Sequence, residues 1–467
     1  MYALLMLSGN ARSFLYSTVV VWLFGMSACM EGPHRFVLDK ADDPASPPDA
    51  GIPDGDLFMD GFPPHVPTKG CGDMPPFPPT LPKPGDAWRQ FGHDATHANR
   101  SSATVGSAPQ VLWKAEIHES AYALNPVVDE NGNLYATTDE QLYAFTPNGE
   151  LRWRTGDTPP GYTGVGFRGV AIQQDGSVVT SLIDGVVRGY SATGAELFVT
   201  TLPSPTPKLT TPPTLDSNGT IYVGGTEANG LSWTPSVYAL RSNGEVAWST
   251  VLEGKALEVS AIAIDATNSL YVSLGFKDAF TAAFEGRVVK LNDKGEVLWS
   301  ISNKSYARAP AITSAGDIWV AVDEDNKIDP VPYLYRYSSE GIPLAFVVNL
   351  RFVSQGPPAV DLAGNAYLGM AGGLAAFNPA GEESWRIWAN PYPDPAFRIW
   401  SHSAVDAEGT VVISDSVGAI RGVRNGCVIF SINRDGPSPT TMNDSVVIGA
   451  DGTIYAGSPS KYVYAFR

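Results

Sequence analysis

The sequence predicts an all-β protein, an eight-bladed β-propeller of four-stranded antiparallel blades, and the main observation is a repeat. The clearest copies contain an apolar run, a turn with Asp or Asn and Gly, a Tyr-containing strand, a further strand, a second Gly turn and a closing aromatic residue. The first turn recurs every 43 to 49 residues, at Gly132, Gly176, Gly219, Asn268, Gly316, Gly364, Gly409 and Gly452. Short strands that repeat with a period in the forties are typical of propeller blades.

Composition and local strand patterns agree with this fold class. The 467 residues include 47 Gly and 38 Pro, and only 17% are charged, as in turn-rich β proteins. Segments such as GTIYVGG (219–225) place β-branched and aromatic residues between turn formers, which indicates buried strands. Pairs such as Asn131-Gly132 provide the positive φ that tight hairpins need.

The way the repeat begins and ends predicts how the ring closes. The closing aromatic residues are Trp153, Phe198, Trp248, Trp299, Phe346, Trp385 and Phe430, one fewer than the turns. An eighth, Trp113, precedes the first turn, and the last copy stops after its third strand at Arg467. We therefore expect residues 111–117 to supply the fourth strand of the last blade, which removes two open sheet edges. The aromatic residues are expected to pack between neighbouring blades.

The first 85 residues predict export and a tether. Arg12 precedes the uncharged stretch SFLYSTVVVWLFGMSA (13–28), which is short for a membrane span and suits a signal peptide over residues 1–29. Met26 to Cys29 resembles a bacterial lipobox, in which the cysteine is lipidated; an ordinary cleaved signal and an uncleaved anchor are the alternatives. Residues 30–85 are rich in Pro, Asp and Gly and predict a disordered tether, and residues 86–467 form the propeller.

Charge and cysteine content restrict the partners. The net charge of −17 argues against nucleic acid and anionic membrane surfaces, so the membrane is contacted through the lipid anchor only. With Cys29 lipidated, Cys71 and Cys427 remain and could form a disulfide between the tether and the seventh blade. Sequence alone does not establish that the two cysteines are close.

Two histidines have the spacing of metal ligands. His93 and His97 are four residues apart, which would suit zinc on a helix with an acidic partner. They lie in the turn-like segment HDATHANRS (93–101), with no third ligand nearby. We therefore expect surface or strand-edge histidines and no metal site.

The repeat text resembles the pyrroloquinoline-quinone-type β-propeller family. Matching segments are YAFTPNGELRW (143–153), YALRSNGEVAW (238–248), VKLNDKGEVLW (289–299) and AAFNPAGEESW (375–385), and WRQFGHDATHANRS (88–101) resembles the lead-in before the first blade. The family includes quinoprotein alcohol dehydrogenases, and also cofactor-free members such as the propeller lipoprotein of the outer-membrane barrel-assembly machine.

This chain departs from the enzymes of that family. The quinoprotein dehydrogenases carry adjacent cysteines over the cofactor, and an Asp base beside a calcium held by Glu and Asn. Here no two of the three cysteines are adjacent, the insertions that carry those ligands are not recognisable, and no Cys-x-x-Cys-His haem motif occurs. The resemblance therefore favours a non-catalytic member without a cofactor.

One position of the repeat could line a binding site. The residue eight before each turn begins the first strand and should face the mouth of the central channel; around the ring these are Leu124, Arg168, Thr211, Ser260, Arg308, Gly356, Ser401 and Asp444. The candidate binding residues are Arg168, Arg308, Gln355, Trp400, His402, Asn443 and Asp444. Such a set could hold a small anion or an acidic peptide segment. The alternative is a solvated, salt-bridged channel entrance.

These observations together predict an exported, lipid-anchored binding scaffold at the bacterial cell envelope, in the outer membrane or at the periplasm or cell surface. We expect a monomeric propeller that binds an envelope protein or peptide without catalysis. One alternative is a quinoprotein-type oxidoreductase with pyrroloquinoline quinone and calcium. The other is a surface carbohydrate-binding or adhesin-like propeller that uses Trp233, Tyr392 and Trp400 as its platform.

The anchoring hypothesis predicts the outcome of a single substitution. Cys29→Ser should move the protein from the membrane fraction to the soluble fraction, because the thioether-linked lipid is the proposed attachment. Immunoblotting of the two fractions measures this, with Cys71→Ser as the matched control that should leave the distribution unchanged. A Cys29→Ser protein that stays with the membrane would support an uncleaved anchor instead.

Overall fold

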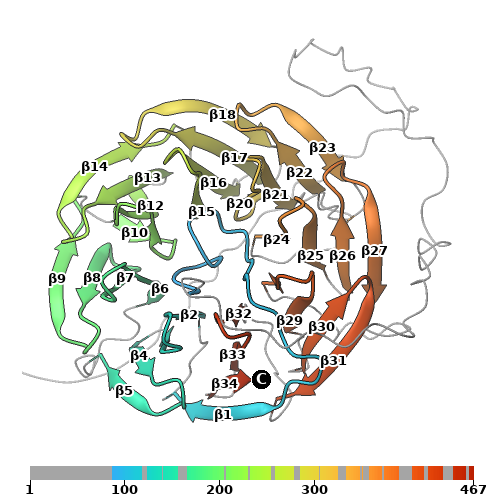
Figure 1. The fold of residues 1–467 in the computed structure, drawn as a ribbon. Helices are drawn as coiled ribbons and strands as arrows, with labels where there is room; N and C mark the ends of the chain where they lie inside the picture. Colours follow the sequence, from blue (N-terminus) through green and yellow to red (C-terminus); the bar gives the residue numbers. More distant parts are fainter. Residues whose placement is uncertain are drawn as a thin grey trace, which may run out of the picture. The chain divides into compact units, whose positions relative to one another are not determined.

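Eight antiparallel sheets follow one another around a central channel in chain order (Figure 1). The computed structural model describes residues 87–117, 124–138, 140–155, 166–203, 207–229, 232–253, 258–277, 284–303, 306–323, 333–347, 350, 357–370, 373–388, 402–414, 419–434, 445–458 and 462–467. The predicted signal peptide and tether, with Cys29 and Cys71, lie outside these residues. In the described part of the chain, no helix is long and apolar enough to cross a membrane.

The first four blades, each given from its innermost to its outermost strand, have these bounds. Blade 1 is β2 (Leu124–Val128), β3 (Leu134–Thr137), β4 (Leu142–Phe145) and β5 (Leu151–Arg154). Blade 2 is β6 (Phe167–Ile172), β7 (Val178–Leu182), β8 (Val186–Tyr190) and β9 (Glu196–Thr201). Blade 3 is β10 (Pro207–Leu209) with β11 (Thr214–Leu215), then β12 (Ile221–Asn229), β13 (Ser232–Leu240) and β14 (Val246–Val251). Blade 4 is β15 (Glu258–Ile264), β16 (Leu270–Lys277), β17 (Phe284–Leu291) and β18 (Val297–Asn303).

The other four blades follow the same plan. Blade 5 is β19 (Tyr306–Ala307) with β20 (Ala311–Ile312), then β21 (Ile318–Asp323), β22 (Tyr333–Tyr337) and β23 (Pro343–Val347). Blade 6 is β24 (Ala359–Val360), β25 (Ala366–Met370), β26 (Gly373–Phe377) and β27 (Glu383–Trp388). Blade 7 is β28 (Ala404–Val405), β29 (Val411–Ser414), β30 (Ala419–Arg424) and β31 (Cys427–Asn433). Blade 8 is β32 (Val446–Ile448), β33 (Ile454–Ser458), β34 (Tyr462–Phe466) and β1 (Val111–Glu116).

The alternation of strand direction gives the ring two different ends. In each blade the first and third hairpin turns lie at one end of the channel, which we call the turn end. The second hairpin and the connection to the next blade lie at the other end, which we call the mouth end. At the turn end, side chains hydrogen-bond to the backbone of the first turns and fix their conformation. In blade 3, Asp216 accepts from the backbone N–H groups of Asn218 (2.8 Å) and Thr220 (2.9 Å).

The ring closes as the sequence predicts. β1 pairs antiparallel with β34, from Val111 opposite Phe466 to Glu116 opposite Tyr462. Figure 1 shows the blue β1 beside the red β34, so strands from opposite ends of the propeller domain complete one sheet. The aromatic residue of this added strand, Trp113, donates its indole N–H to the carbonyl of Pro147 in blade 1 (2.7 Å). The added strand therefore joins the last blade to the first.

Most neighbouring blades are connected by one repeated contact. Blade 5 is the exception to the expected packing between blades, because Phe346 is 49% exposed and stacks on Tyr333 of its own blade, with 5.1 Å between ring centres. The closing Trp of a blade lies on the Gly of the next blade's third turn and donates to a carbonyl two residues before that Gly. Trp153 donates to Ala192 (2.9 Å), Trp248 to Asp293 (2.9 Å) and Trp299 to Ser339 (3.0 Å). A Cβ on Gly194 would lie 2.7 Å from the Trp153 ring. Only a glycine, with φ of +87° at this position, allows the ring to approach so closely.

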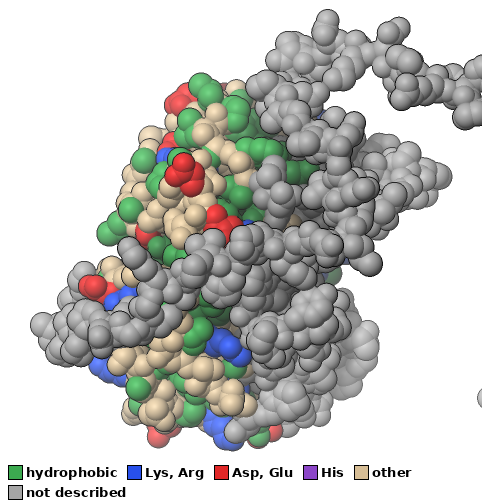
Figure 2. Space-filling model, turned by 90° about the vertical axis from the view of Figure 1, so that its right-hand side faces the viewer, with side chains coloured by type: hydrophobic (Ala, Val, Ile, Leu, Met, Phe, Trp, Pro, Cys, Tyr) green, Lys and Arg blue, Asp and Glu red, His purple; other side chains and the backbone are tan. Residues whose placement is uncertain are grey.

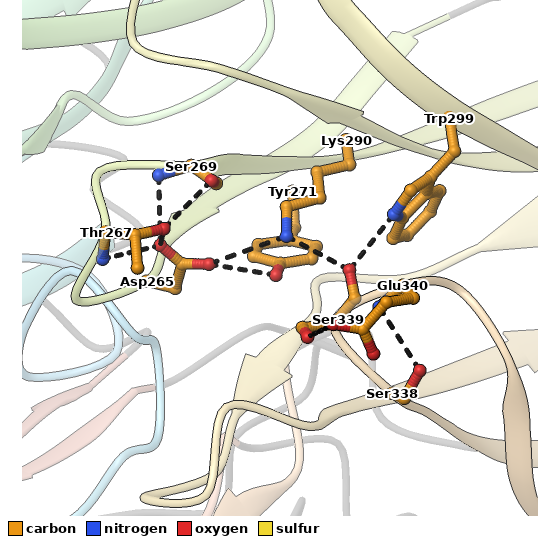
Figure 3. Close-up of polar contacts among 9 residues, drawn as sticks. All are labelled: Asp265, Thr267, Ser269, Tyr271, Lys290, Trp299, Ser338, Ser339 and Glu340. Atoms are coloured by element: carbon orange, nitrogen blue, oxygen red, sulfur yellow. Dashed lines mark hydrogen bonds and ion pairs between the residues drawn. The ribbon is translucent and has the colours of Figure 1, made fainter.

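Blade 4 adds a partly buried charge to this contact (Figure 3). Most blades have Ala or Gly in the third strand opposite the closing aromatic residue, whereas blade 4 has Lys290 opposite Trp299. The Lys290 ammonium donates to the carbonyl of Ser339 in blade 5 (3.0 Å) and lies 3.8 Å from the Asp265 carboxylate. It also stands 4.9 Å from the centre of the Tyr271 ring. Blades 4 and 5 are thus joined by an indole and an ammonium that share one acceptor.

The outermost strands carry apolar side chains on their solvent side. Examples are Leu197, Val251 and Leu344, which are about half exposed. On the side of the ring seen in Figure 2, such hydrophobic side chains lie among acidic and basic ones. Single apolar residues on an exposed strand are ordinary for a soluble surface.

The blade contact predicts unequal effects of one substitution at matched glycines. Gly244→Ala should destabilise the protein by more than about 2 kcal/mol, because its Cβ would lie 2.3 Å from the Phe198 ring. Gly316→Ala is the control: its φ of +87° matches the +86° of Gly244, but no atom lies within 4 Å of the added Cβ. Only backbone strain of about 1–2 kcal/mol is expected there. Urea unfolding measures both, and equal losses would show that the ring contact adds nothing.

Candidate functional site in the central channel

The turn end of the channel is covered by the segment Trp88–Val105, which we call the strap. Its backbone carbonyls accept hydrogen bonds from the last residue, or next to last, of successive innermost strands (Figure 1). In these hydrogen bonds, of 2.6 to 2.8 Å, a blade N–H donates to a strap carbonyl: Val128 donates to Trp88, Ile172 to Arg89, Ile264 to Ala95, Ile312 to Thr96, Val360 to Ala98, and Val405 to Asn99. The acceptor residues follow one another along the strap in the same order as the blades that they bind.

Blade 3 is bound by a side chain instead. The Gln90 amide oxygen accepts from the Leu215 N–H (2.6 Å), and its amide nitrogen donates to the Leu215 carbonyl (3.2 Å). Seven blades are therefore hydrogen-bonded to one segment, and Ala103 and Val105 pack in the same core cluster as β32 of blade 8. The strap satisfies backbone groups that would otherwise be buried without partners.

The strap folds tightly so that aromatic rings fill the channel. Gly92 has a φ of +74°, and a Cβ there would lie 2.5 Å from the His97 backbone. Phe91 packs against Ala261 of blade 4 and Ala309 of blade 5. Its ring also meets His97 and, from blade 7, His402, with ring centres 5.0 and 5.2 Å apart. Phe91 therefore contacts blades 4, 5 and 7 from within the channel.

The expectation of surface or strand-edge histidines at 93 and 97 was wrong. His97 is 1% exposed and His93 is 9% exposed, because the lead-in crosses the channel instead of lying on the surface. Burial lowers the pKa of His97 to about 4, an effect that Asp94 opposes and His402 reinforces. Burial also lowers the pKa of His402 to about 4. Both imidazoles are therefore neutral at pH 7, and the described residues contain no cluster of His, Cys, Asp or Glu that could hold a metal ion.

A small cavity lies beside these rings. Its volume is about 10 Å³, and Phe91, Asn125, His402 and Ser445 are among the residues that line it. The Ser445 hydroxyl lies 3.0 Å from Nδ1 of His402 and also contacts the Asn125 amide oxygen. His402, a predicted binding residue, is thus placed in the channel but is already hydrogen-bonded within the chain.

The mouth end holds the two predicted arginines. Arg168 is the second residue of β6, and its Nε donates to the Leu209 carbonyl (3.2 Å). Arg308 follows β19 in blade 5. The structure brings a carboxylate to them that sequence analysis missed: burial raises the pKa of Glu258, while the positive charges of Arg308, Arg168 and Lys208 oppose that rise. Glu258 begins β15, so its position in the repeat was a signal that could have identified it.

The remaining predicted site residues are not tested. Gln355, Trp400, Asn443 and Asp444, with Tyr392 of the alternative platform, lie outside the described residues. Trp233 is described and is 37% exposed on β13. Cys427 is buried and disulfide-bonded, whereas both other cysteines lie outside the described residues, so its pairing with Cys71 stays a prediction.

Comparison with known proteins identifies the class of propeller. Residues 183–329, from blade 2 to blade 5, match the family model described as outer membrane protein assembly factor BamB. Sequence comparison with curated proteins returned no match. Over these residues the chain is similar to the pyrroloquinoline-quinone-type propeller repeat of BamB, as the sequence predicts.

Solved structures share the fold at low identity. A europium-containing methanol dehydrogenase aligns with a TM-score of 0.62 and 12% identity, over 82% of this chain and 98% of that one. BamB from Moraxella catarrhalis aligns with a TM-score of 0.55 and 14% identity, over 77% of this chain and 100% of that one. The Dos1 propeller aligns with a TM-score of 0.52 and 10% identity, over 82% and 94% of the two chains.

The described mouth does not fit a hard metal ion of the kind that the dehydrogenase contains. Such cations take several oxygen ligands, usually with more than one carboxylate. Here the positive charges of Arg308, Arg168 and Lys208 act on the carboxylate of Glu258, and the described residues contain no group of His, Cys, Asp or Glu that could hold a metal ion. This arrangement favours an anionic guest over a cation.

The buried imidazoles predict how stability depends on pH. The unfolded chain binds protons at these histidines below about pH 6.5, but the folded chain does not until about pH 4. Stability should therefore be full above pH 6.5 and fall as the pH drops towards 4, by up to about 3 kcal/mol for each imidazole. Urea unfolding between pH 7.5 and 4.5 measures this slope. His402→Asn should flatten it, and His65→Asn, in the predicted tether, should not; parallel profiles for all three proteins would contradict the assignment.

Proposed function

We propose that the chain is an exported, lipid-anchored propeller that binds a protein partner at the bacterial envelope and catalyses no reaction. The observation that carries the proposal is the match of residues 183–329 to the BamB family model, together with alignment over the whole length of a BamB structure. BamB is described as an outer membrane protein assembly factor. We infer that this chain binds a protein partner because it is similar to BamB.

Among the described residues, the turn end of the channel is filled and offers a partner no entry. The strap occupies the turn end with a hydrogen bond to each of seven blades, and Phe91 fills the centre. A partner that reaches the channel therefore approaches from the mouth end. The chemistry of that end, with charged side chains around Glu258, suits polar recognition of another chain.

The oxidoreductase alternative rests on the fold shared with methanol dehydrogenase, and fold does not determine function. The two functions make opposite predictions for one purified sample. As a scaffold, the protein should bind no pyrroloquinoline quinone when both quinone and calcium are added, and should reduce no electron-acceptor dye with alcohols.

In intact cells the scaffold should form cross-links to a defined envelope protein, detected by mass spectrometry after mild lysine cross-linking. Absorbance of quinone that remains with the protein after gel filtration, together with alcohol-dependent dye reduction, would overturn the proposal. Cross-links that do not exceed those of an unrelated envelope protein expressed at the same level would also overturn it.

A further inference from the structure

Every histidine of the described residues lies in the channel. The ring of Phe91 meets the imidazoles of His97 and His402 edge-on, with ring centres 5.0 and 5.2 Å apart. The third, His93, meets the ring of Trp88 in the same way at 5.0 Å. None of the three is more than 9% exposed. Side chains that can gain a charge near neutral pH are therefore concentrated where water has little access.

The direct contacts of the two imidazoles beside Phe91 are with neutral groups. Nε2 of His97 lies 3.4 Å from the Thr214 hydroxyl of blade 3, and its Nδ1 is buried without a hydrogen-bond partner. Nδ1 of His402 lies 3.0 Å from the Ser445 hydroxyl of blade 8. A proton on either imidazole would thus add a buried charge that no contacting side chain balances.

The carboxylate whose charge acts on His97 is that of Asp94, in the same loop. It is held by other groups. One oxygen of Asp94 accepts from the backbone N–H (2.9 Å) and the hydroxyl (2.5 Å) of Thr96, and the other lies 3.6 Å from Nδ1 of His93. A positive charge on His93 would therefore have a partner close by, whereas charges on His97 and His402 would repel each other across Phe91.

The other charged groups that contact the strap do so away from Phe91. The Arg89 guanidinium donates to a carbonyl of blade 2 (2.9 Å), and that of Arg100 donates to a carbonyl of blade 6 (3.1 Å). On blade 7, the carboxylate of Asp406 accepts from the N–H of Val105, at the far end of the strap (3.0 Å). Blades 4 and 5 pack alanine side chains against Phe91.

The backbone of the loop is strained. His93, His97 and Asn99 have φ values of +83°, +54° and +49°, and they are three of the six non-glycine residues with positive φ in the described part of the chain. Side chains rarely adopt this region, and the strain persists only while the surroundings hold it. A short segment that combines strained backbone with buried ionisable groups has the properties of a conformational switch.

We propose that residues 90–97, which we call the plug, leave the channel when His97 and His402 take up protons, while the eight blades stay folded. The strap stays bound on both sides of the plug, because the Arg89 carbonyl accepts from blade 2 and the Ala98 carbonyl accepts from blade 6. Departure of the plug breaks the hydrogen bonds of Gln90, Ala95 and Thr96 to blades 3, 4 and 5. It opens the turn end of the channel to water. This inference goes beyond the proposed function and does not depend on it.

The direction of the pH effect follows from burial. Burial lowers the pKa of both imidazoles to about 4 in the closed form, from an ordinary value of 6.5 that exposure to water restores. The closed form is therefore fully favoured above pH 6.5 and loses its advantage as the pH falls towards 4. Because opening takes up two protons, its equilibrium constant should rise by up to about a hundredfold for each pH unit within this range.

The test is hydrogen–deuterium exchange of the purified full chain between pH 7.5 and 4.5, followed by mass spectrometry, with labelling times scaled to the intrinsic rate at each pH. The amides to follow are those of the plug and of Ile264 and Ile312, which donate to it. They should lose protection as the pH falls. Their exchange should depend little on urea, whereas exchange of the β12 and β13 amides should depend on it strongly, because a local opening exposes little surface.

Two substitutions separate the contributions of the imidazoles. His97→Asn and His402→Asn should each reduce the pH dependence to about tenfold per unit, and the double variant should remove most of it. Asn tolerates the positive φ at position 97. His93→Asn is the matched control: it lies in the same loop and also has positive φ, but its charge has a carboxylate partner, so acid release should persist. If circular dichroism shows that the double variant does not fold, His402→Asn, which lies outside the plug, provides the test.

Three results would overturn the inference. Plug amides with the same urea dependence as the β12 amides would show that the plug leaves only when the whole propeller unfolds. An unchanged pH dependence in the folded double variant, or in His402→Asn, would show that these imidazoles do not control the plug. A loss of acid release in His93→Asn as large as in His402→Asn would assign the switch to a different histidine.

Discussion

The structure depends on the contact between the closing aromatic residue of one blade and the turn glycine of the next. A single four-stranded blade has two faces and too few residues to bury both, so its stability comes from its neighbours. The indole ring buries a large apolar surface in that contact. Its N–H also fixes the orientation of the ring, because it donates to one carbonyl, as Trp248 donates to Asp293 (2.9 Å). The glycine is required because any Cβ would occupy the space of the ring. Since Trp113 makes the same contact from β1, the contact also joins the last blade to the first.

Ring closure in turn creates the channel and its two ends. The innermost strands converge, and the N–H groups near their ends point to the axis at the turn end, where water has little access. The strap provides one acceptor for each of seven blades, so that the segment before the first blade becomes part of the core. The same segment brings Phe91 and His97 to the centre, where burial keeps the imidazole neutral. Ring closure therefore explains both why the strap fills the channel and why the histidines in it are neutral.

In the described part of the chain, the two ends of the channel differ in chemistry. At the turn end, apolar rings and neutral imidazoles are packed and hydrogen-bonded. At the mouth end, the positive charges of Arg308, Arg168 and Lys208 act on Glu258, and neighbouring innermost strands are connected by side-chain hydrogen bonds to backbone carbonyls. The likeness to BamB on one side and to a methanol dehydrogenase on the other shows that one propeller supports different functions. The residues at the mouth are where this chain can differ from both.

The sequence by itself determined the blade number, the strand order and the closure by residues 111–117, because these follow from local turn chemistry and from a period that repeats along the chain. It also placed Arg168 on the innermost strand of blade 2 and Arg308 next to the innermost strand of blade 5. Only the tertiary structure decided that Glu258 and Lys208 join them, and that His93 and His97 are buried. The physical reason is that these environments are made by residues far apart in the chain: Phe91 meets His402, and Gln90 binds Leu215. No local pattern encodes such a contact, since it exists only once eight blades have closed around one axis.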